Sequence, residues 1–253
     1  MGSCPQVLSI DGVGKSFGAF RVLDDVSFDV LEGETIGLIG PNGAGKTTLF
    51  NIISGFLRAG EGAVHYRGRD ITSFGPRQRA NEGLIRTFQK SMVFPELTVR
   101  ENIALALRAQ SGSGYRWWSA ARAVGAADRR ADDIVERVGL AHRLDRVVKN
   151  LSYGEQRMVD VLISLALEPR VLLLDEPTAG LARAEADILL ESIKLHDNKT
   201  SVILIAHDLD IVFSSCDRIA ALNLGRLIAV DTPAAIRAND DVRKAYLGAA
   251  ALS

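Results

Sequence analysis

The chain has 253 residues, 47% of them hydrophobic, and a formal net charge of −1. This length can bury a substantial core, as one large domain or a domain with an embedded subdomain, and the near-neutral charge does not mark the chain as a nucleic-acid binder. The two cysteines, Cys4 and Cys216, lack metal-ligand spacing and argue against a disulfide framework, which suits a reducing cytosol.

The N-terminal sequence MGSCPQVLSIDG lacks the charged-then-apolar pattern of a signal peptide. No apolar run approaches the roughly 20 residues of a membrane-spanning helix. If the protein works at a membrane, we therefore expect another chain to span it.

The first third of the chain has the pattern of a β-rich region. Residues 7–40 alternate β-favouring residues with Gly and Asp turns, which predicts several short antiparallel strands leading into one buried strand, TIGLIG. A glycine-rich loop and a helix, TTLFNIISGF, follow. A strand pair is expected at residues 62–71 and a short helical segment from Pro76 to Arg86.

The middle of the chain is predominantly helical in pattern. Residues 97–110 have helical periodicity, with Thr98 as a possible N-cap and Glu101 three residues later. Residues 111–125 form a Gly/Ser-flanked insertion, and residues 126–140 form an amphipathic helix ended by Gly139. A loop at the start of residues 151–169 then enters another helix.

The last third alternates strands and helices. The expected elements are strand 171–177, helix 182–196, strand 201–207, helix 208–216 and strand 218–223. This β/α alternation predicts an α/β fold with a mostly parallel sheet and helices on both faces.

The stretch GPNGAGKTT, residues 40–48, predicts a phosphate-binding loop. It fits G-x-x-x-x-G-K-[ST] through Gly40, Gly45, Lys46 and Thr47. The glycines let successive N–H groups point into one concavity, and the following helix adds its N-terminal dipole. Lys46 is expected to reach the β/γ-phosphates, and the Thr47 hydroxyl to ligate Mg²⁺. An accidental glycine-rich turn is the alternative.

A second site is predicted where the strand VLLLDEP ends. Its buried apolar residues would deliver Asp175 and Glu176 to the C-terminal edge of a parallel sheet, where ligands bind. Asp175 would hold Mg²⁺, directly or through water, and Glu176 could act as general base for an attacking water. The alternative is a surface acid pair that caps a turn.

LSYGEQR, residues 151–157, narrows the choice of family. In this order, the phosphate loop, LSYGEQ, VLLLDEP and a histidine after SVILIA resemble the nucleotide-binding subunits of ABC transporters. The resemblance extends from VLSIDGVGKSFG to the terminal AYLG. LSYGEQ, with Tyr153 in place of a glycine, and the insertion at 111–125 resemble the branched-chain amino acid transport subgroup.

This resemblance implies a fold and its boundaries. We expect one ABC-type P-loop NTPase domain at residues 6–253, with an N-terminal antiparallel β subdomain. Within it, residues 6–92 and 169–233 would form the nucleotide-binding core, residues 93–168 an inserted helical subdomain, and residues 234–253 a helical tail.

The resemblance also implies ligands and partners. ATP and Mg²⁺ would bind between two ATP-binding subunits, in a homodimer or a heterodimer, and membrane-spanning permease subunits would be the partners. A substrate-binding protein would act indirectly, no nucleic acid is expected, and the chain would lie peripherally on the cytoplasmic face of the inner membrane. The implied nucleotide ligands are Phe17, Gly40, Pro41, Asn42, Gly43, Ala44, Gly45, Lys46, Thr47, Thr48, Ser152, Gly154 and Glu155.

Several roles rest on position within the family pattern. Phe17 matches the aromatic residue that stacks on adenine, although a packed core Phe is the alternative. Gln89 matches a glutamine that approaches Mg²⁺ and the attacking water, and whose loop touches the membrane subunit. His207 matches a histidine that contacts the γ-phosphate. The expected catalytic residues are Glu176, His207, Gln89 and Lys46. The expected metal ligands are Thr47, Gln89 and Asp175.

Some positions depart from the family pattern. Ala182 stands where Asp or Asn is usual in the loop that couples two ATP sites, Ser164 where an Arg is common, and Ala206 where relatives often have Glu. Trp117 and Trp118 in the insertion could pack in a helix or lie near the bilayer surface.

These observations together indicate an ATPase that powers an importer for branched-chain or related amino acids. Another cargo is the main alternative: urea or amides, aromatic acids, or lipopolysaccharide in an exporter. A soluble ABC ATPase acting on DNA or ribosomes is the other, although the chain has neither long coiled coils nor two ATPase cassettes.

Overall fold

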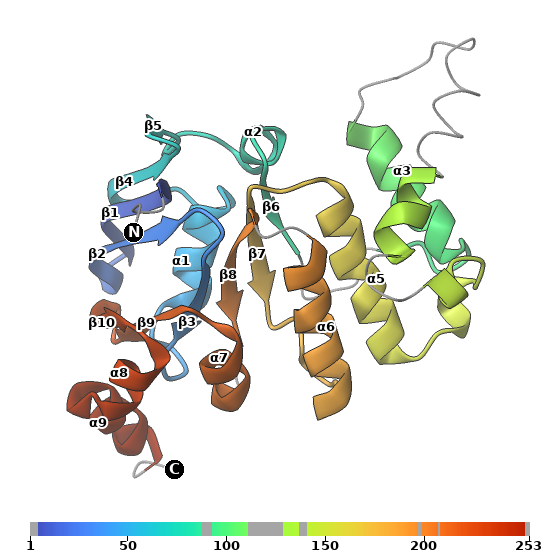
Figure 1. The fold of residues 1–253 in the computed structure, drawn as a ribbon. Helices are drawn as coiled ribbons and strands as arrows, with labels where there is room; N and C mark the ends of the chain where they lie inside the picture. Colours follow the sequence, from blue (N-terminus) through green and yellow to red (C-terminus); the bar gives the residue numbers. More distant parts are fainter. Residues whose placement is uncertain are drawn as a thin grey trace. The chain divides into compact units, whose positions relative to one another are not determined.

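The computed structural model describes residues 5–87, 93–110, 129–136, 141–196, 199–206 and 208–250. The chain divides into two compact units (Figure 1). The first, called here the core unit, consists of residues 1–86, 170–176 and 199–253. The second, the helical unit, consists of residues 87–169 and 177–198.

An antiparallel sheet of four strands begins the core unit. Its strands lie in the order β2-β1-β4-β5, namely β2 (Phe20–Leu31), β1 (Gln6–Phe17), β4 (Glu61–Tyr66) and β5 (Arg69–Asp70). The prediction of several short strands within residues 7–34 was wrong, because β1 and β2 are 12 residues long each. Register shifts along the β1–β2 pair let both strands pass their Gly and Asp positions without turning.

A second sheet carries the nucleotide-binding elements. Its strands lie in the order β10-β9-β3-β8-β7-β6, namely β10 (Arg226–Asp231), β9 (Arg218–Asn223), β3 (Thr35–Ile39), β8 (Ser201–Ile205), β7 (Val171–Asp175) and β6 (Leu84–Arg86). All neighbouring pairs are parallel except β10 with β9. The predicted α/β fold with a mostly parallel core sheet is confirmed.

Burial on both faces explains the apolar runs of the central strands. Every residue of β7 and β8 is buried. One set of alternating residues, including Leu173 and Ile203, joins a hydrophobic cluster with helix α1 (Lys46–Ile53) and the antiparallel sheet. This cluster fixes α1, and therefore the loop before it, against the carboxyl ends of the parallel strands.

The expected helix from Pro76 to Arg86 is shorter than predicted. Helix α2 spans Pro76–Asn81, and residues 84–86 form strand β6, parallel to β7. Gly83 ends the helical segment with a φ of 94°, a backbone conformation that glycine adopts without strain. Leu84 and Ile85 are then buried at the sheet, where their apolar side chains favour a strand.

The helical unit contains the expected helices. The helices expected at 97–110, 151–169 and 182–196 are α3 (Val99–Gln110), α5 (Tyr153–Ala166) and α6 (Arg183–His196), and residues 129–136 of the helix expected at 126–140 are helical. The single turns Ala141–Arg143 and Val148–Asn150 were not predicted, and the predicted helix end at Gly139 lies outside the described residues. The capping prediction for Thr98 is confirmed, because the Thr98 N–H donates to Glu101 Oε2 at 2.8 Å and the Glu101 N–H donates to Thr98 Oγ1 at 3.2 Å.

The C-terminal part of the core unit contains the helix expected at 208–216, the strand expected at 218–223 and helices in the tail expected at 234–253, whereas β10 was not predicted. Helix α7 (Leu209–Ser215) precedes β9, and β10, α8 (Pro233–Ala238) and α9 (Asp240–Ala250) follow it. Figure 1 shows α8 and α9 beside the β9–β10 end of the sheet. Among the described residues, no helix is long and apolar enough to cross a membrane.

Candidate nucleotide site

The phosphate loop connects β3 to α1, as the sequence predicts. Gly45 precedes α1 with a φ of 102°, and a Cβ there would lie 2.7 Å from Leu23 Cδ2 and 3.0 Å from the Val22 carbonyl oxygen. Only glycine fits both the positive φ and the short distances at this position, because it has no Cβ. Helix α1 begins at Lys46, so its first N–H groups lie next to the loop and favour an anion there.

Lys46 lies over the loop that precedes it. Its ammonium group donates hydrogen bonds to the carbonyl oxygens of Gly40 at 2.6 Å and Pro41 at 3.0 Å. Burial lowers the pKa of Lys46, and the negative charge of Glu176 acts in the opposite direction. A cation thus stands where the loop and the helix N-terminus also attract negative charge.

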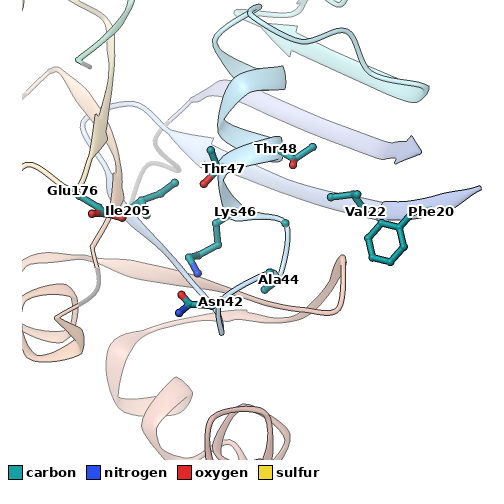
Figure 2. A pocket seen from close by; sticks show the side chains of 11 residues that line it. Phe20, Val22, Asn42, Ala44, Lys46, Thr47, Thr48, Glu176 and Ile205 are labelled. Carbon is teal, nitrogen blue, oxygen red and sulfur yellow. The ribbon is translucent and has the colours of Figure 1, made fainter. Parts of the chain in front are cut away.

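A cavity of about 420 Å³ opens beside this loop. It is lined by Phe20, Val22, Asn42, Gly43, Ala44, Gly45, Lys46, Thr47, Thr48, Glu176 and Ile205. Figure 2 shows Phe20 and Val22 on one side of the loop and Glu176 on the other, with Lys46 and Thr47 between them. The cavity therefore joins a phosphate-binding loop, a cation, a hydroxyl and a carboxylate.

Glu176 follows the last residue of β7 and adopts an unusual backbone conformation. Its φ is 50°, in the left-handed region that few non-glycine residues adopt, and its N–H donates to the Ile205 carbonyl oxygen at 2.8 Å. This bond to the end of β8 fixes the turn after β7. The Glu176 side chain lines the cavity, as the prediction of a base beside the γ-phosphate requires.

Asp175 is the last residue of β7 and is buried. Its Oδ2 accepts a hydrogen bond from Arg86 Nη2 at 2.9 Å, and it is not among the residues that line the cavity. Among the described residues, no group of three or more His, Cys, Asp or Glu side chains could hold a metal. Mg²⁺ needs no such group, because it binds through one or two protein oxygens together with phosphates and water. The Thr47 hydroxyl and the Asp175 carboxylate are oxygen donors of the kind that fits.

The aromatic residues near the cavity differ from the expectation. Phe17 and Phe20 face each other across the β1–β2 hairpin, with 52% and 72% of their surfaces exposed. Exposure argues against the interpretation of Phe17 as a core residue, but Phe20 and Val22 are the hairpin residues that line the cavity. Neither residue was predicted from the sequence, although both belong to the same strand as the buried Leu23.

The LSYGEQ residues belong to the helical unit. Ser152 is the N-cap of α5, where its Oγ accepts from the Glu155 N–H at 3.2 Å and Glu155 Oε2 accepts from the Ser152 N–H at 2.8 Å. A Cβ on Gly154 would lie 2.7 Å from Glu185 Oε1. The structure thus brings Ser152, Gly154 and Glu155 together at one helix N-terminus, but they do not line the cavity of the core unit.

Three predicted features lie outside the described residues. They are Gln89, His207 and the Trp117–Trp118 insertion.

Comparison with known proteins decides the family. The ABC transporter family model matches residues 23–179, which include the phosphate loop, LSYGEQ and the end of β7. The chain belongs to the ABC transporter family. The predicted resemblance is confirmed. A second model, the branched-chain amino acid ATP-binding cassette transporter, matches residues 226–251 of this ABC protein, from β10 into the C-terminal tail.

Curated relatives of this ABC protein match almost its full length. It is 38% identical over 252 residues to the high-affinity branched-chain amino acid transport ATP-binding protein LivG of Escherichia coli, covering 96% of this chain and 98% of the relative. It is 36% identical over 251 residues to BraF of Pseudomonas aeruginosa, described by the same words, with coverage of 96% and 98%.

Solved structures share the fold. The ADP conformation of MJ1267, an ATP-binding cassette of an ABC transporter, matches with a TM-score of 0.82 and 30% identity over 96% of this chain and 99% of that one. A nucleotide-free ATP-binding cassette from an ABC transporter matches with a TM-score of 0.80 and 29% identity, also over 96% and 99%. The ABC protein described here is therefore a nucleotide-binding subunit with ATPase activity.

Proposed function

We propose that this chain binds ATP with Mg²⁺ in the phosphate-loop cavity and that its hydrolysis of ATP powers an importer for branched-chain amino acids. One observation carries the proposal. The cavity combines the loop, Lys46, Thr47 and Glu176 in a chain that matches the LivG proteins over 96% of its length. The match of residues 226–251 to the branched-chain amino acid transporter model supports the cargo.

The residues of the cavity divide the work of binding. Loop amides from Gly43 to Thr48 and the start of α1 would hold the phosphates, and Lys46 would exchange its two carbonyl partners for phosphate oxygens. Phe17 and Phe20 would contact the adenine. Thr47 and Asp175 would hold Mg²⁺, which would neutralise negative charge on the bound phosphates.

Hydrolysis needs a water held in line with the γ-phosphate. Glu176 would accept its proton as general base, and Gln89 and His207 would orient the water and the γ-phosphate. Most of the remaining rate enhancement comes from positioning and charge neutralisation. Ser152, Gly154 and Glu155 of a second ATP-binding subunit would close over the γ-phosphate at the N-terminus of α5.

Closure of the two subunits would act on permease subunits in the membrane, through the loop of Gln89 and the helical segment. The chain would then work peripherally, on the cytoplasmic face of the membrane. A substrate-binding protein would deliver the amino acid to the permease. Cargo is selected by these partners, and the comparisons favour branched-chain amino acids over urea, amides, aromatic acids or lipopolysaccharide.

Transport by cells that lack this chain tests the proposal. We expect deletion to reduce uptake of radiolabelled leucine, isoleucine and valine. The wild-type chain should restore uptake, and Glu176→Gln should not. Uptake of glucose is the control. If the uptake of all three amino acids is unchanged in the deletion strain, the cargo proposal is wrong, and labelled urea and aromatic acids are the next candidates.

A further inference from the structure

Arg86 is the last residue of β6 and contacts two other elements, α1 and β7. Its Nη1 donates to Asn51 Oδ1 at 2.6 Å and to Ser54 Oγ at 3.0 Å, on and just after α1. Its Nη2 donates to Asp175 Oδ2 at 2.9 Å, at the end of β7. The guanidinium group therefore joins the helix that follows the phosphate loop to the strand that ends in the acids.

This ion pair is largely shielded from solvent. The side chain of Arg86 is 12% exposed and that of Asp175 is 4% exposed. The guanidinium carbon lies 4.9 Å from the ring centre of Phe50 and 5.6 Å from that of Phe56, so aromatic faces flank the cation. A planar group held by two neutral acceptors and two rings has little freedom to follow a moving carboxylate.

A carboxylate that binds metal works best when a neighbour fixes its orientation. Groups that orient metal ligands typically change metal affinity by about 10- to 100-fold when they are removed. Arg86 holds the Asp175 carboxylate through Oδ2. The same Arg86 is tied to α1, which starts at the residue before Thr47.

We propose that Arg86 is a positioning residue for the magnesium site: it fixes the Asp175 carboxylate through Oδ2, with Asn51 and Ser54 holding the guanidinium in place. Arg86 touches neither nucleotide nor metal in this arrangement. The inference rests on the proposed role of Asp175 as a magnesium ligand. According to this inference, the Arg86–Asp175 ion pair increases the affinity for Mg²⁺ and also stabilises the core unit.

The test measures ATP binding with and without magnesium. The quantity is the ratio of the ATP dissociation constant in EDTA to that in Mg²⁺, for the wild-type chain and for Arg86→Lys, measured by calorimetry. Lysine keeps the charge but lacks the planar fork that reaches Asn51, Ser54 and Asp175 together. We expect the ratio to fall by about 10- to 100-fold, or to 1 if the wild-type ratio is smaller, while ATP affinity in EDTA stays unchanged.

Arg69→Lys is the matched control. Arg69 also pairs with a carboxylate, that of Glu82 at 3.3 Å, and lies 4.8 Å from the ring centre of Phe74, but its side chain is 64% exposed. Its ratio should equal that of the wild-type chain. Asn51→Ala is the second variant, because it removes one anchor of Arg86 and leaves the charge. It should lower the ratio by a smaller factor, and it carries the test if Arg86→Lys does not fold.

The outcomes separate the two proposals. A wild-type ratio of 1 would remove Asp175 from magnesium binding and overturn the proposed metal site itself. A large wild-type ratio that Arg86→Lys and Asn51→Ala leave unchanged would overturn the inference alone. Equal losses of affinity with and without Mg²⁺ would also overturn it, since they indicate a purely structural ion pair.

Discussion

The ammonium group of Lys46 donates to the carbonyl oxygen of Gly40 at 2.6 Å, so the cation of the phosphate loop is satisfied by the first residue of that loop. This bond pairs the ammonium group with the loop itself. A phosphate must replace it, and the strength of nucleotide binding therefore depends on how much better Lys46 binds an anion than a neutral carbonyl.

Lys46→Met is expected to weaken ATP binding strongly. A hydrogen bond to a charged group contributes about 1.5–3 kcal/mol, which corresponds to about 10- to 150-fold in the dissociation constant. Titration with a fluorescent ATP analogue measures it. Lys244→Met, at a 77% exposed side chain on α9, is the control and should bind as the wild-type chain does. Equal affinities for the Lys46 and Lys244 variants would exclude the role given to Lys46.

Glu176→Gln should separate binding from hydrolysis. The amide keeps the size of the side chain but cannot accept a proton from water, and such an acceptor typically contributes about 10²- to 10⁴-fold. Removing a negative charge beside the γ-phosphate should also favour the closed dimer. A turnover assay, run beside size-exclusion chromatography with Mg²⁺-ATP, should show slow hydrolysis and an ATP-bound dimer.

The outcomes for Glu176→Gln test the two roles separately. Turnover near the wild-type rate would exclude Glu176 as the base. A slow variant that stays monomeric would keep the base and make dimer closure dependent on the membrane subunits. Glu168→Gln is the control, because Glu168 also has a positive φ, of 49°, but belongs to the helical unit and does not line the cavity.

Phe17→Ala should weaken ATP binding without affecting the fold. Stacking of an aromatic side chain on a base contributes about 1–3 kcal/mol, or about 5- to 150-fold in affinity. Phe17 is 52% exposed, so its loss should leave the unfolding temperature nearly unchanged. Phe20→Ala, at the cavity wall, should have a comparable effect, and the 54% exposed Phe94 of the helical unit provides the control. Lower thermal stability with unchanged affinity would make Phe17 a packing residue.

The fold and the phosphate site follow from local signals. Gly40, Gly45 and Lys46 belong to a motif whose backbone geometry requires those residue types. The continuous apolar sequence of β7 is typical of a strand that is buried on both faces of a sheet. Both were predictable from neighbouring residues alone. The strand Leu84–Arg86 was not predictable, because three residues are too few to show the alternating burial pattern of a strand. Its pairing partner, Val171, is also far away in the sequence.

The role of Phe20 and the pairing of Arg86 depend on tertiary contacts in the same way. Phe20 reaches the cavity because the β1–β2 hairpin turns at residues 18 and 19, which places it opposite Phe17. The contact of Arg86 with Asp175 joins residues 89 positions apart, and no sequence pattern near Arg86 predicts this contact.

Ala182→Asn should stabilise the helical unit. Ala182 precedes α6, its carbonyl accepts from the Ala186 N–H at 3.0 Å, and its own N–H donates to Glu185 Oε2 at 2.9 Å. The Glu185 side chain thus makes one of the two hydrogen bonds of a capping box. The other bond needs a side-chain oxygen at position 182, which asparagine would supply. The gain should be about 0.5–2 kcal/mol, measured by denaturant unfolding. Ala182→Val, which offers no side-chain acceptor and ranks with Ala at this position, should give no gain; equal gains for the two variants would contradict a capping effect.

Tyr246 on α9 should make the stability of the core unit sensitive to alkaline pH. Burial raises the pKa of the Tyr246 hydroxyl to about 12, although a hydrogen bond from the Gly40 backbone acts in the opposite direction. In the unfolded chain this pKa is about 10. Between these two values the unfolded chain releases the proton more readily than the folded one, so the free energy of unfolding falls as pH rises from about 10 to about 12. Below about pH 10 both states keep the proton, and the contribution is constant.

The difference between wild-type and Tyr246→Phe isolates this effect from other groups that titrate at high pH. Phenylalanine keeps the partly buried ring but has no proton to lose, so the free energy of unfolding of Tyr246→Phe should fall less steeply than that of the wild-type chain above about pH 10. Urea unfolding at several pH values from about 9 to 11.5 measures both curves. Tyr153→Phe, at a ring that is 59% exposed, is the control and should follow the wild-type curve. Parallel curves for wild-type and Tyr246→Phe would mean that the hydroxyl next to Gly40 titrates alike in both states, and that α9 does not bury it beside the phosphate loop.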